Sequence, residues 1–246
     1  MIYQNEDRES RLKNIRPLNR DLKDLRLYLH FDLKRKDFYL LQAADIYFQH
    51  LIWNGLKCPN YNHIYIYTGN TTEEAISEVL TPESWHAAGI ATLDEKSYKN
   101  GTPRQREQLV LNAIESGLRD IAKLDHLDPE IIEKSIQKAR ETGFEHEFII
   151  ANKENKKFHA EATYKILKDG HKVQPFLYIK NKETKETKTI KLKVADSIQL
   201  GWWIMGLTVT NKEIRVKSSK AATASVWLEG LEPNPVFKTE GLFEKN

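Results

Sequence analysis

Histidine is the residue type in this chain best suited to chemistry near neutral pH, and eight histidines are scattered along it. His30 and Asp32 stand two positions apart in an alternating segment. On a strand they would share one face, where they could bind a metal or hold a water molecule. With His63 and Tyr65, they are the polar groups that we would expect to line a pocket. The same pairs are also common on the solvated face of a strand.

None of the recognisable catalytic motifs is complete. In HEFII, His146 is followed by Ile150 where a zinc protease needs a second histidine. In HAE, His159 has no downstream cysteine pair, which a zinc deaminase requires. The single cysteine, Cys58, rules out an internal disulfide, and Pro59 directly after it favours a small buried residue before a turn. The chain also lacks a Gly-x-Ser-x-Gly elbow and a glycine-rich phosphate loop. We therefore expect no catalytic residue, no metal and no cofactor.

Charge is unevenly distributed along the 246 residues, of which 40% are hydrophobic and 30% charged. Residues 1–143 carry 20 Lys and Arg against 22 Asp and Glu, a balance of −2; residues 144–246 carry 18 against 13, a balance of +5. Arg215 is the only arginine in the second part, whereas nucleic-acid readers favour arginine, so we expect no nucleic-acid partner. The start has no signal-peptide pattern and no run of apolar residues is long enough to span a membrane. We expect a cytoplasmic protein without a membrane partner.

The first part of the chain mixes strand and helix signals. Residues 4–24 are densely charged and are interpreted as a solvated arm. Alternation predicts a strand over 25–33, and the segment 62–69 predicts another, ended by Gly69. Residues 37–53 are apolar at nearly every position; we favour a buried helix there, with a strand as the alternative. Thr71 or Thr72 is expected to cap a short helix that reaches Leu80.

Two helices are expected in the middle of the chain. Thr102 is a good N-cap and Pro103 fits the first helical position, after which apolar residues recur at intervals of three and four. A second helix should begin at the cap Asp128 and end at Gly143. Because the link between them is short, we expect the two helices to be antiparallel neighbours.

From residue 144 the apolar period changes from helical to alternating. At least six short strands are expected, including 157–167 and a partner that returns after the Lys-Asp-Gly turn. Pro175 lacks a ladder donor, so its strand should lie at an edge or carry a bulge. The apolar segment 198–209 is interpreted as a central strand with Trp203 facing the core. Whether Trp202 is buried or exposed stays open. A further strand is expected in TASVWLEG, residues 223–230.

These patterns predict an α+β fold with two parts. Residues 1–143 form a mixed α/β part that carries an aromatic cluster and a two-helix hairpin. Residues 144–246 form an antiparallel sheet: a meander, a sandwich or an open barrel. The absence of a Gly-, Ser- or Pro-rich linker suggests that the parts pack as one unit.

The function that these observations favour is a non-enzymatic protein-protein interaction module whose partner is another protein. Small bacterial immunity or antitoxin proteins have this general character, although no motif here identifies a family. The contact residues that we expect are Asp120, Asp125, Asp128, Glu130 and Trp202, since an acidic patch could cover a basic site on the partner. The alternative is an enzyme or ligand-binding protein with a pocket between helices and sheet, lined by His30, Asp32, His63 and Tyr65.

Overall fold

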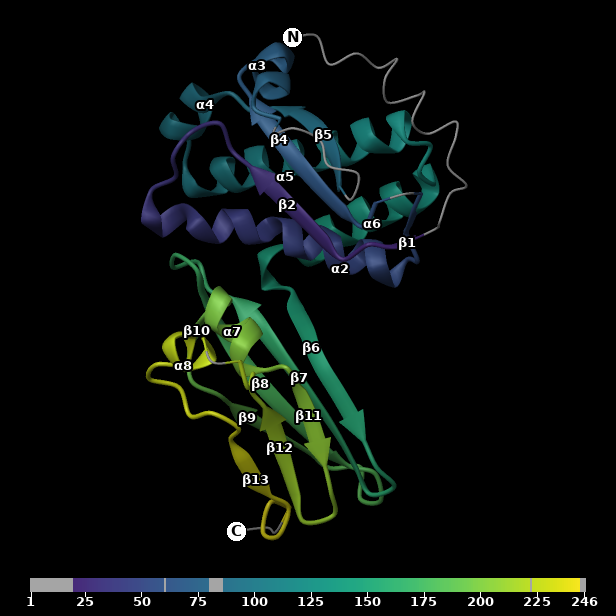
Figure 1. Ribbon diagram of the computed structural model, residues 1–246, viewed down its shortest axis with the longest axis vertical. Helices are drawn as coiled ribbons and strands as arrows, with labels where there is room; N and C mark the ends of the chain where they lie inside the picture. The colour runs from purple at the N-terminus through teal and green to yellow at the C-terminus, as the bar shows by residue number, and fades with distance from the viewer. Residues whose placement is uncertain (1–19, 60, 80–85, 222, 244–246) are drawn as a thin grey trace. The chain divides into compact units, whose positions relative to one another are not determined.

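The computed structural model (Figure 1) describes residues 20–59, 61–79, 86–221 and 223–243. The chain divides into two compact units: Met1–Lys34 with Leu40–Gly143, and Arg35–Tyr39 with Phe144–Asn246. The main division therefore falls at Gly143, where the sequence changes its period. The expected arm at 4–24 lies mostly outside the described residues. That the two parts pack as one unit stays a prediction.

A parallel three-stranded sheet forms the centre of the first unit. Its strands are β2 (Asp24–Tyr28), β4 (His63–Gly69) and β5 (His86–Thr92), in the order β2-β4-β5. A two-stranded ladder of β1 (Arg20–Asp21) and β3 (Lys57–Cys58) accompanies it. The strand expected over 25–33 is too long, because β2 ends at Tyr28 and the chain bends at His30 and Phe31. A hydrogen bond from the His30 backbone N–H to the Thr68 hydroxyl, at 3.3 Å, replaces the ladder there.

Helices connect and cover these strands. Residues 37–53 are helical, as favoured from the sequence: the 3-10 helix η1 (Arg35–Gln42) runs into α2 (Ala43–Trp53). Thr71 caps the short helix α3 (Thr72–Ser77), and α4 (Glu95–Asn100) follows β5. The predicted hairpin is confirmed as α5 (Pro103–Leu124), capped by Thr102, and α6 (Pro129–Thr142), capped by Asp128. Gly143 follows α6 with φ +54°, a left-handed conformation that favours glycine.

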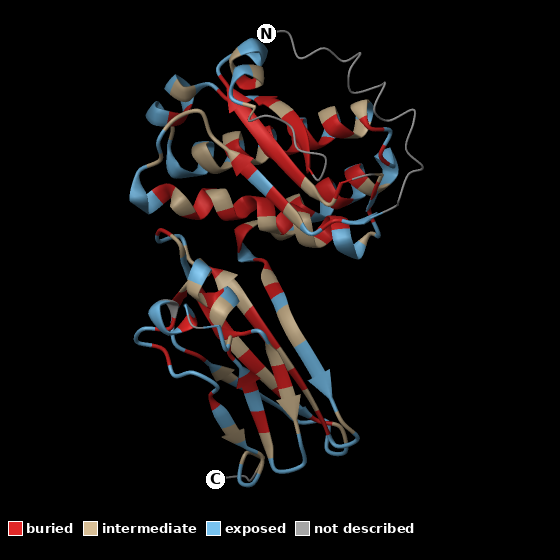
Figure 2. Ribbon diagram, viewed as in Figure 1, coloured by how far each residue is buried: buried red, intermediate tan, exposed pale blue. Residues whose placement is uncertain are grey.

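Glycines allow α5 to pack unusually closely on the sheet. A Cβ added to Gly117 of α5 would lie 2.5 Å from Cγ2 of Ile66 in β4. A Cβ added to Gly89 of β5 would lie 2.5 Å from the carbonyl oxygen of Gly117. The α5 backbone therefore rests directly on β4 and β5, and Ile66 and Ile114 on either side of this contact are fully buried (Figure 2).

The second unit is built from two antiparallel sheets around one core. The larger sheet pairs β6 (Glu147–Glu154), β7 (Phe158–Ile166) and β8 (Lys172–Asn181), and β8 also pairs with β9 (Thr187–Lys191) and β10 (Ala195–Asp196). The smaller sheet has the order β11 (Gly206–Val209), β12 (Glu213–Lys217), β13 (Val236–Lys238). Since buried residues of both sheets form one apolar cluster and β11 contacts β6 and β7, the arrangement is a sandwich.

Two of the expected strands in this unit are wrong. The segment 198–209 begins as the helix α7 (Ser197–Trp203), and only its end forms β11. Residues 223–230 contain the short helix α8 (Ala224–Trp227) where a strand was expected. The α7 prediction failed because a short run of large apolar residues has no readable period, so its start signal at Asp196 decides the structure.

Pro175 lies where β8 changes partner on its outer side. Residues on one side of it pair with β10 and those on the other side pair with β9. The Pro175 carbonyl accepts a hydrogen bond from the Leu192 N–H at 3.0 Å, so its nitrogen points the same way, to an interrupted part of the ladder. The missing donor therefore leaves no broken strand pair, in agreement with the expected irregularity.

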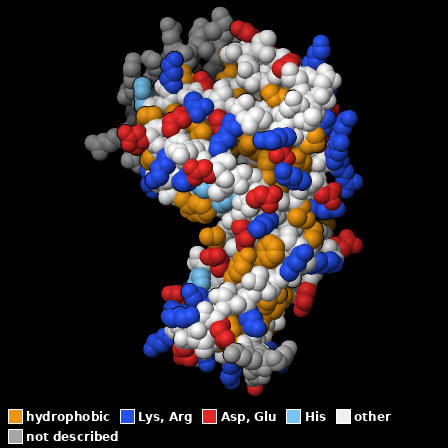
Figure 3. Space-filling model, turned by 180° about the vertical axis from the view of Figure 1, so that it is seen from behind, with side chains coloured by type: hydrophobic (Ala, Val, Ile, Leu, Met, Phe, Trp, Pro, Cys, Tyr) orange, Lys and Arg blue, Asp and Glu red, His pale blue; other side chains and the backbone are white. Residues whose placement is uncertain are grey.

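No helix in the described ranges is both long and apolar enough to cross a membrane. Charged side chains of both signs are interspersed over the face of each unit in Figure 3.

Candidate interaction surface and polar sheet face

The start of α7 is fixed by a capping box that the sequence contains but that strand-period reasoning overlooked. The Asp196 carboxylate accepts a hydrogen bond from the Ile198 N–H, and the Gln199 side-chain oxygen accepts one from the Asp196 N–H, each at 3.0 Å. An aspartate followed three residues later by glutamine is a recognised signal for a helix start. Together these bonds begin a helix directly after β10.

The two tryptophans of α7 have different environments. Trp203 is buried, and its indole N–H donates to the carbonyl oxygen of Glu232 at 2.7 Å. Trp202 is half-buried and packs against the core cluster of the second unit. The helix therefore anchors itself through Leu200 and Trp203 and leaves part of Trp202 accessible.

Large apolar side chains on and beside the two short helices remain exposed. Ile198 in α7 is 53% exposed, Met205 directly after α7 is 64% exposed, and Val226 in α8 is 73% exposed. Helices α7 and α8 contact each other. We call Ile198, Met205 and Val226 the α7 patch. Clusters of exposed apolar side chains are a feature of protein-protein contact sites.

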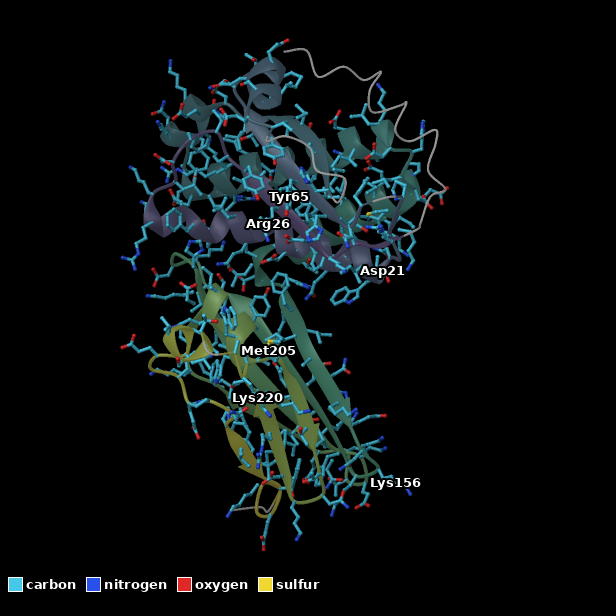
Figure 4. All side chains as sticks on the ribbon, viewed as in Figure 1. Asp21, Arg26, Tyr65, Lys156, Met205 and Lys220 are labelled. Carbon is cyan, nitrogen blue, oxygen red and sulfur yellow. The ribbon has the colours of Figure 1, made fainter. Side chains whose placement is uncertain are left out.

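Two lysines border the patch at Met205. The Met205 N–H donates to the carbonyl oxygen of Lys217, and the Ser219 N–H donates to that of Trp202, each at 2.8 Å. The segment from Lys217 to Lys220 therefore runs alongside the end of α7, as Figure 4 shows for Met205 and Lys220. Both lysines are exposed, and neither forms an ion pair within the described part of the chain. This side of the patch is positively charged.

The four acidic candidates at the corner between α5 and α6 do not face one direction. Asp120 accepts a hydrogen bond from the Ile90 N–H of β5 at 3.0 Å, which covers an edge of the sheet. Asp125 is buried, with 7% of its surface exposed. Asp128 caps α6 by accepting hydrogen bonds from the N–H groups of Glu130 and Ile131, at 2.9 and 3.3 Å. Glu130 is exposed. Three of the four carboxylates thus have local structural positions.

The four pocket candidates of the alternative function lie at two ends of the parallel sheet. His30 follows the carboxyl end of β2, where its Nδ1 lies 3.1 Å from the Thr68 hydroxyl. His63 begins β4, five residues before Thr68, which is roughly 16 Å along a strand. Asp32 is exposed beyond β2. Only His63 and Tyr65 come together, with ring centroids 6.2 Å apart.

His63 and Tyr65 belong to a polar and aromatic face of the β2-β4-β5 sheet. The register places Asp24 beside His63 and Arg26 beside Tyr65, on the face opposite α5. The Arg26 guanidinium lies 5.5 Å above the Tyr65 ring, as the labelled side chains in Figure 4 show. Tyr65 also stacks on His86 of β5 at 5.0 Å. This contact row crosses all three strands.

Asp45, in the first turn of α2, adds an unusual carboxyl group to this face. Burial, and the charge of Asp24 close by, raise the pKa of Asp45 to about 7, although Arg26 opposes the shift. Nothing in the sequence marks this residue, because its environment comes from β2, a separate element. Carboxyl groups with a pKa near neutrality are common at functional sites.

Other chemistry is weakly supported. Cys58 is fully buried, and burial raises the pKa of its thiol to about 12, which disfavours a reactive thiolate. Among the described residues no group of three or more His, Cys, Asp or Glu side chains could hold a metal ion.

The comparisons with known proteins give no relative. No protein-family model matches the chain, and neither a curated protein nor a solved structure is significantly similar to it.

Proposed function

We propose that the protein is a protein-protein interaction module that contacts its partner through the α7 patch. The observation that carries this proposal is the exposure of Ile198, Met205 and Val226, each more than half exposed, on two short helices that contact each other. The half-buried Trp202 adjoins them, and tryptophan is the residue type most often found to dominate binding energy.

The charge around the patch indicates the chemistry of the partner. Lys217 and Lys220 border Met205 and have no carboxylate partner in the described chain. A complementary surface would therefore present apolar side chains flanked by Asp or Glu. Such charges mainly accelerate association, whereas the apolar contacts provide affinity.

Photo-crosslinking followed by reconstitution tests the proposal. A photoreactive amino acid replaces Met205 in cells that make the protein, and the same amino acid replaces Val236, which is 42% exposed in β13, as the matched control. The protein that crosslinks only at 205 is purified and its affinity is measured by calorimetry. We expect Met205→Asp to weaken binding about tenfold or more and Val236→Asp to leave it unchanged. Equal binding by the wild type and the Met205→Asp variant would refute the patch as the contact.

A second candidate function is small-ligand binding, including catalysis, on the polar face of the parallel sheet. The specific observation in its favour is the convergence of Arg26, Tyr65 and His63 beside Asp45, whose pKa is about 7. An exposed guanidinium above an aromatic ring suits a ligand that carries both a negative charge and a ring.

Thermal stability in the presence of aromatic carboxylates and mononucleotides tests this candidate. A binding ligand raises the unfolding temperature of the wild type, and Arg26→Gln abolishes the increase. Arg104→Gln, an exposed arginine in the first turn of α5, is the control. An increase that persists in Arg26→Gln, or the absence of any increase, contradicts this function.

A further inference from the structure

A groove lies at the corner of the α5–α6 hairpin, apart from the α7 patch and the polar sheet face. It is bounded by the last two turns of α5, the start of α6 and the link between them, and its volume is about 490 Å³. Small-molecule sites commonly have volumes of roughly 300 to 1,000 Å³. The two helices are joined by only four residues, Asp125–Asp128, so both walls of the groove are held together. We call this feature the α5–α6 groove.

The floor of the groove is apolar. Ala122, Leu127, Pro129 and Ile132 line it. Leu127 is 5% exposed and Ile132 is 1% exposed, so the floor is part of the packing between the helices. A ligand that lies there needs an apolar surface, because the floor offers no hydrogen-bonding side chain.

The rim of the groove carries an excess of positive charge. Arg119, Lys123 and His126 stand on it together with one carboxylate, Glu133. Arg119 donates two hydrogen bonds to Glu133, at 2.6 and 2.8 Å, and these hold the pKa of Glu133 below its usual value. The only acid on the rim is thereby neutralised. Lys123 is exposed and forms no ion pair with a described residue.

The positive rim has a second possible origin, in helix electrostatics. Lys123 lies in the last turn of α5, where a cation is stabilised by the negative end of the helix dipole. This effect explains the charge of Lys123 but not the concave apolar floor beside it. A helix-end lysine also remains free to bind an anion, since a dipole offers it no hydrogen-bond acceptor of full charge.

We propose that the α5–α6 groove binds a small amphiphilic carboxylate, with its aliphatic part on Leu127 and Ile132 and its carboxylate beside Lys123. The complementarity is twofold: apolar body to apolar floor, and anion to unpaired cation. A short anion such as acetate lacks the body, and an aliphatic amine has the wrong charge. The inference is independent of the proposed interaction function, because none of its residues belongs to the α7 patch.

Octanoate is the probe, and backbone amide NMR of the full chain is the measurement. We expect saturable shifts confined to residues 119–133, with a dissociation constant of about 1 mM, given the small number of atoms in the ligand. Acetate and octylamine should bind at least about fivefold more weakly, since each lacks one of the two complementary features. Shifts that do not saturate, shifts spread over the second unit, or equal binding of octylamine would overturn the proposal.

Two variants separate ligand binding from a purely structural role. Lys123→Gln should weaken octanoate binding about two- to fivefold, the range for an exposed ion pair, whereas Lys134→Gln, an exposed lysine of α6 outside the groove, should not change it. Ala122→Phe should fill the groove and abolish binding while the amide spectrum stays dispersed. Undiminished octanoate binding by a folded Ala122→Phe variant would exclude this site.

Discussion

Gly117 gives the sharpest test of how the first unit is packed, because two effects of opposite sign meet there. Glycine in the middle of a long helix is unfavourable, so Gly117→Ala in α5 should gain about 1 kcal/mol of helix propensity. Its new Cβ, however, would lie 2.5 Å from Cγ2 and 3.2 Å from Cβ of Ile66. Ile66 is fully buried on β4 and its branched side chain has little rotamer freedom, so the helix or the strand must move.

The steric term should prevail over the propensity term. Extra methyl groups in a packed core cost about 1–3 kcal/mol, and this contact is shorter than a side chain can absorb alone. We therefore expect Gly117→Ala to lower the free energy of unfolding by about 1–2 kcal/mol overall. Ser116→Ala, at the exposed neighbouring position of α5, provides the propensity gain without the clash and should be neutral or slightly stabilising.

Urea unfolding followed by far-ultraviolet circular dichroism is a suitable assay, because the long helices α5 and α6 belong to the first unit and dominate its signal. Ile66→Ala supplies a further check, since it removes the atoms that the new Cβ meets. The penalty of Gly117→Ala should shrink when it is measured in the Ile66→Ala background. A Gly117→Ala variant that is more stable than the wild type would show that α5 does not rest on β4 as described.

Three further outcomes follow from buried polar groups in the same unit. Glu115→Ala should cost about 3 kcal/mol of unfolding free energy in urea, because it strands the buried Tyr47 hydroxyl, which donates to Glu115 at 2.7 Å, and Arg140, which donates at 2.9 Å; the exposed Glu141→Ala should change stability by less than about 0.5 kcal/mol. Cys58, whose thiol pKa is about 12, should react with a disulfide reagent only as fast as the protein unfolds, and rapid labelling of the native protein would contradict its burial. Asp45 has a folded pKa raised from 3.8 to about 7, so the folded state holds a proton that the unfolded chain releases, and stability should fall as the pH rises from about 4 to 7. Asp45→Asn should remove that fall, giving a variant more stable by on the order of 3 kcal/mol at pH 8 but not at pH 4, and an equal effect at both pH values would show that Asp45 is not protonated in the fold.

Local signals predicted the elements that depend on local chemistry. Thr102 and Asp128 are N-caps followed by proline, and both helices begin at these positions because the caps satisfy N–H groups that the helix itself cannot. The change to alternating residues after Gly143 likewise matches the antiparallel strands β7 and β8. Such patterns need no knowledge of distant residues.

The failures concern features that depend on distant partners. The strand expected over 25–33 stops at Tyr28 because His30 bonds to Thr68, which is 38 residues away. The pKa of Asp45 depends on β2, and the burial of Asp125 depends on packing that charge patterns do not show. The predicted acidic patch therefore separates into capping and packing roles, while the exposed apolar residues Met205 and Val226 were not recognised as candidates at all.

Folding alone gives no reason for the apolar character of the α7 patch. The core of the second unit is closed without it: Leu177 and Val216 are fully buried, and α7 is anchored by Leu200 and Trp203. A side chain that is 64% exposed, such as Met205, gains little from burial, so a polar residue there should fold equally well. Stability and binding are thus separable at this surface: Met205→Asp should unfold at the same urea concentration as the wild type and still lose its partner. A marked loss of stability in that variant would instead mean that the patch is part of the fold, and the interaction proposal would lose its basis.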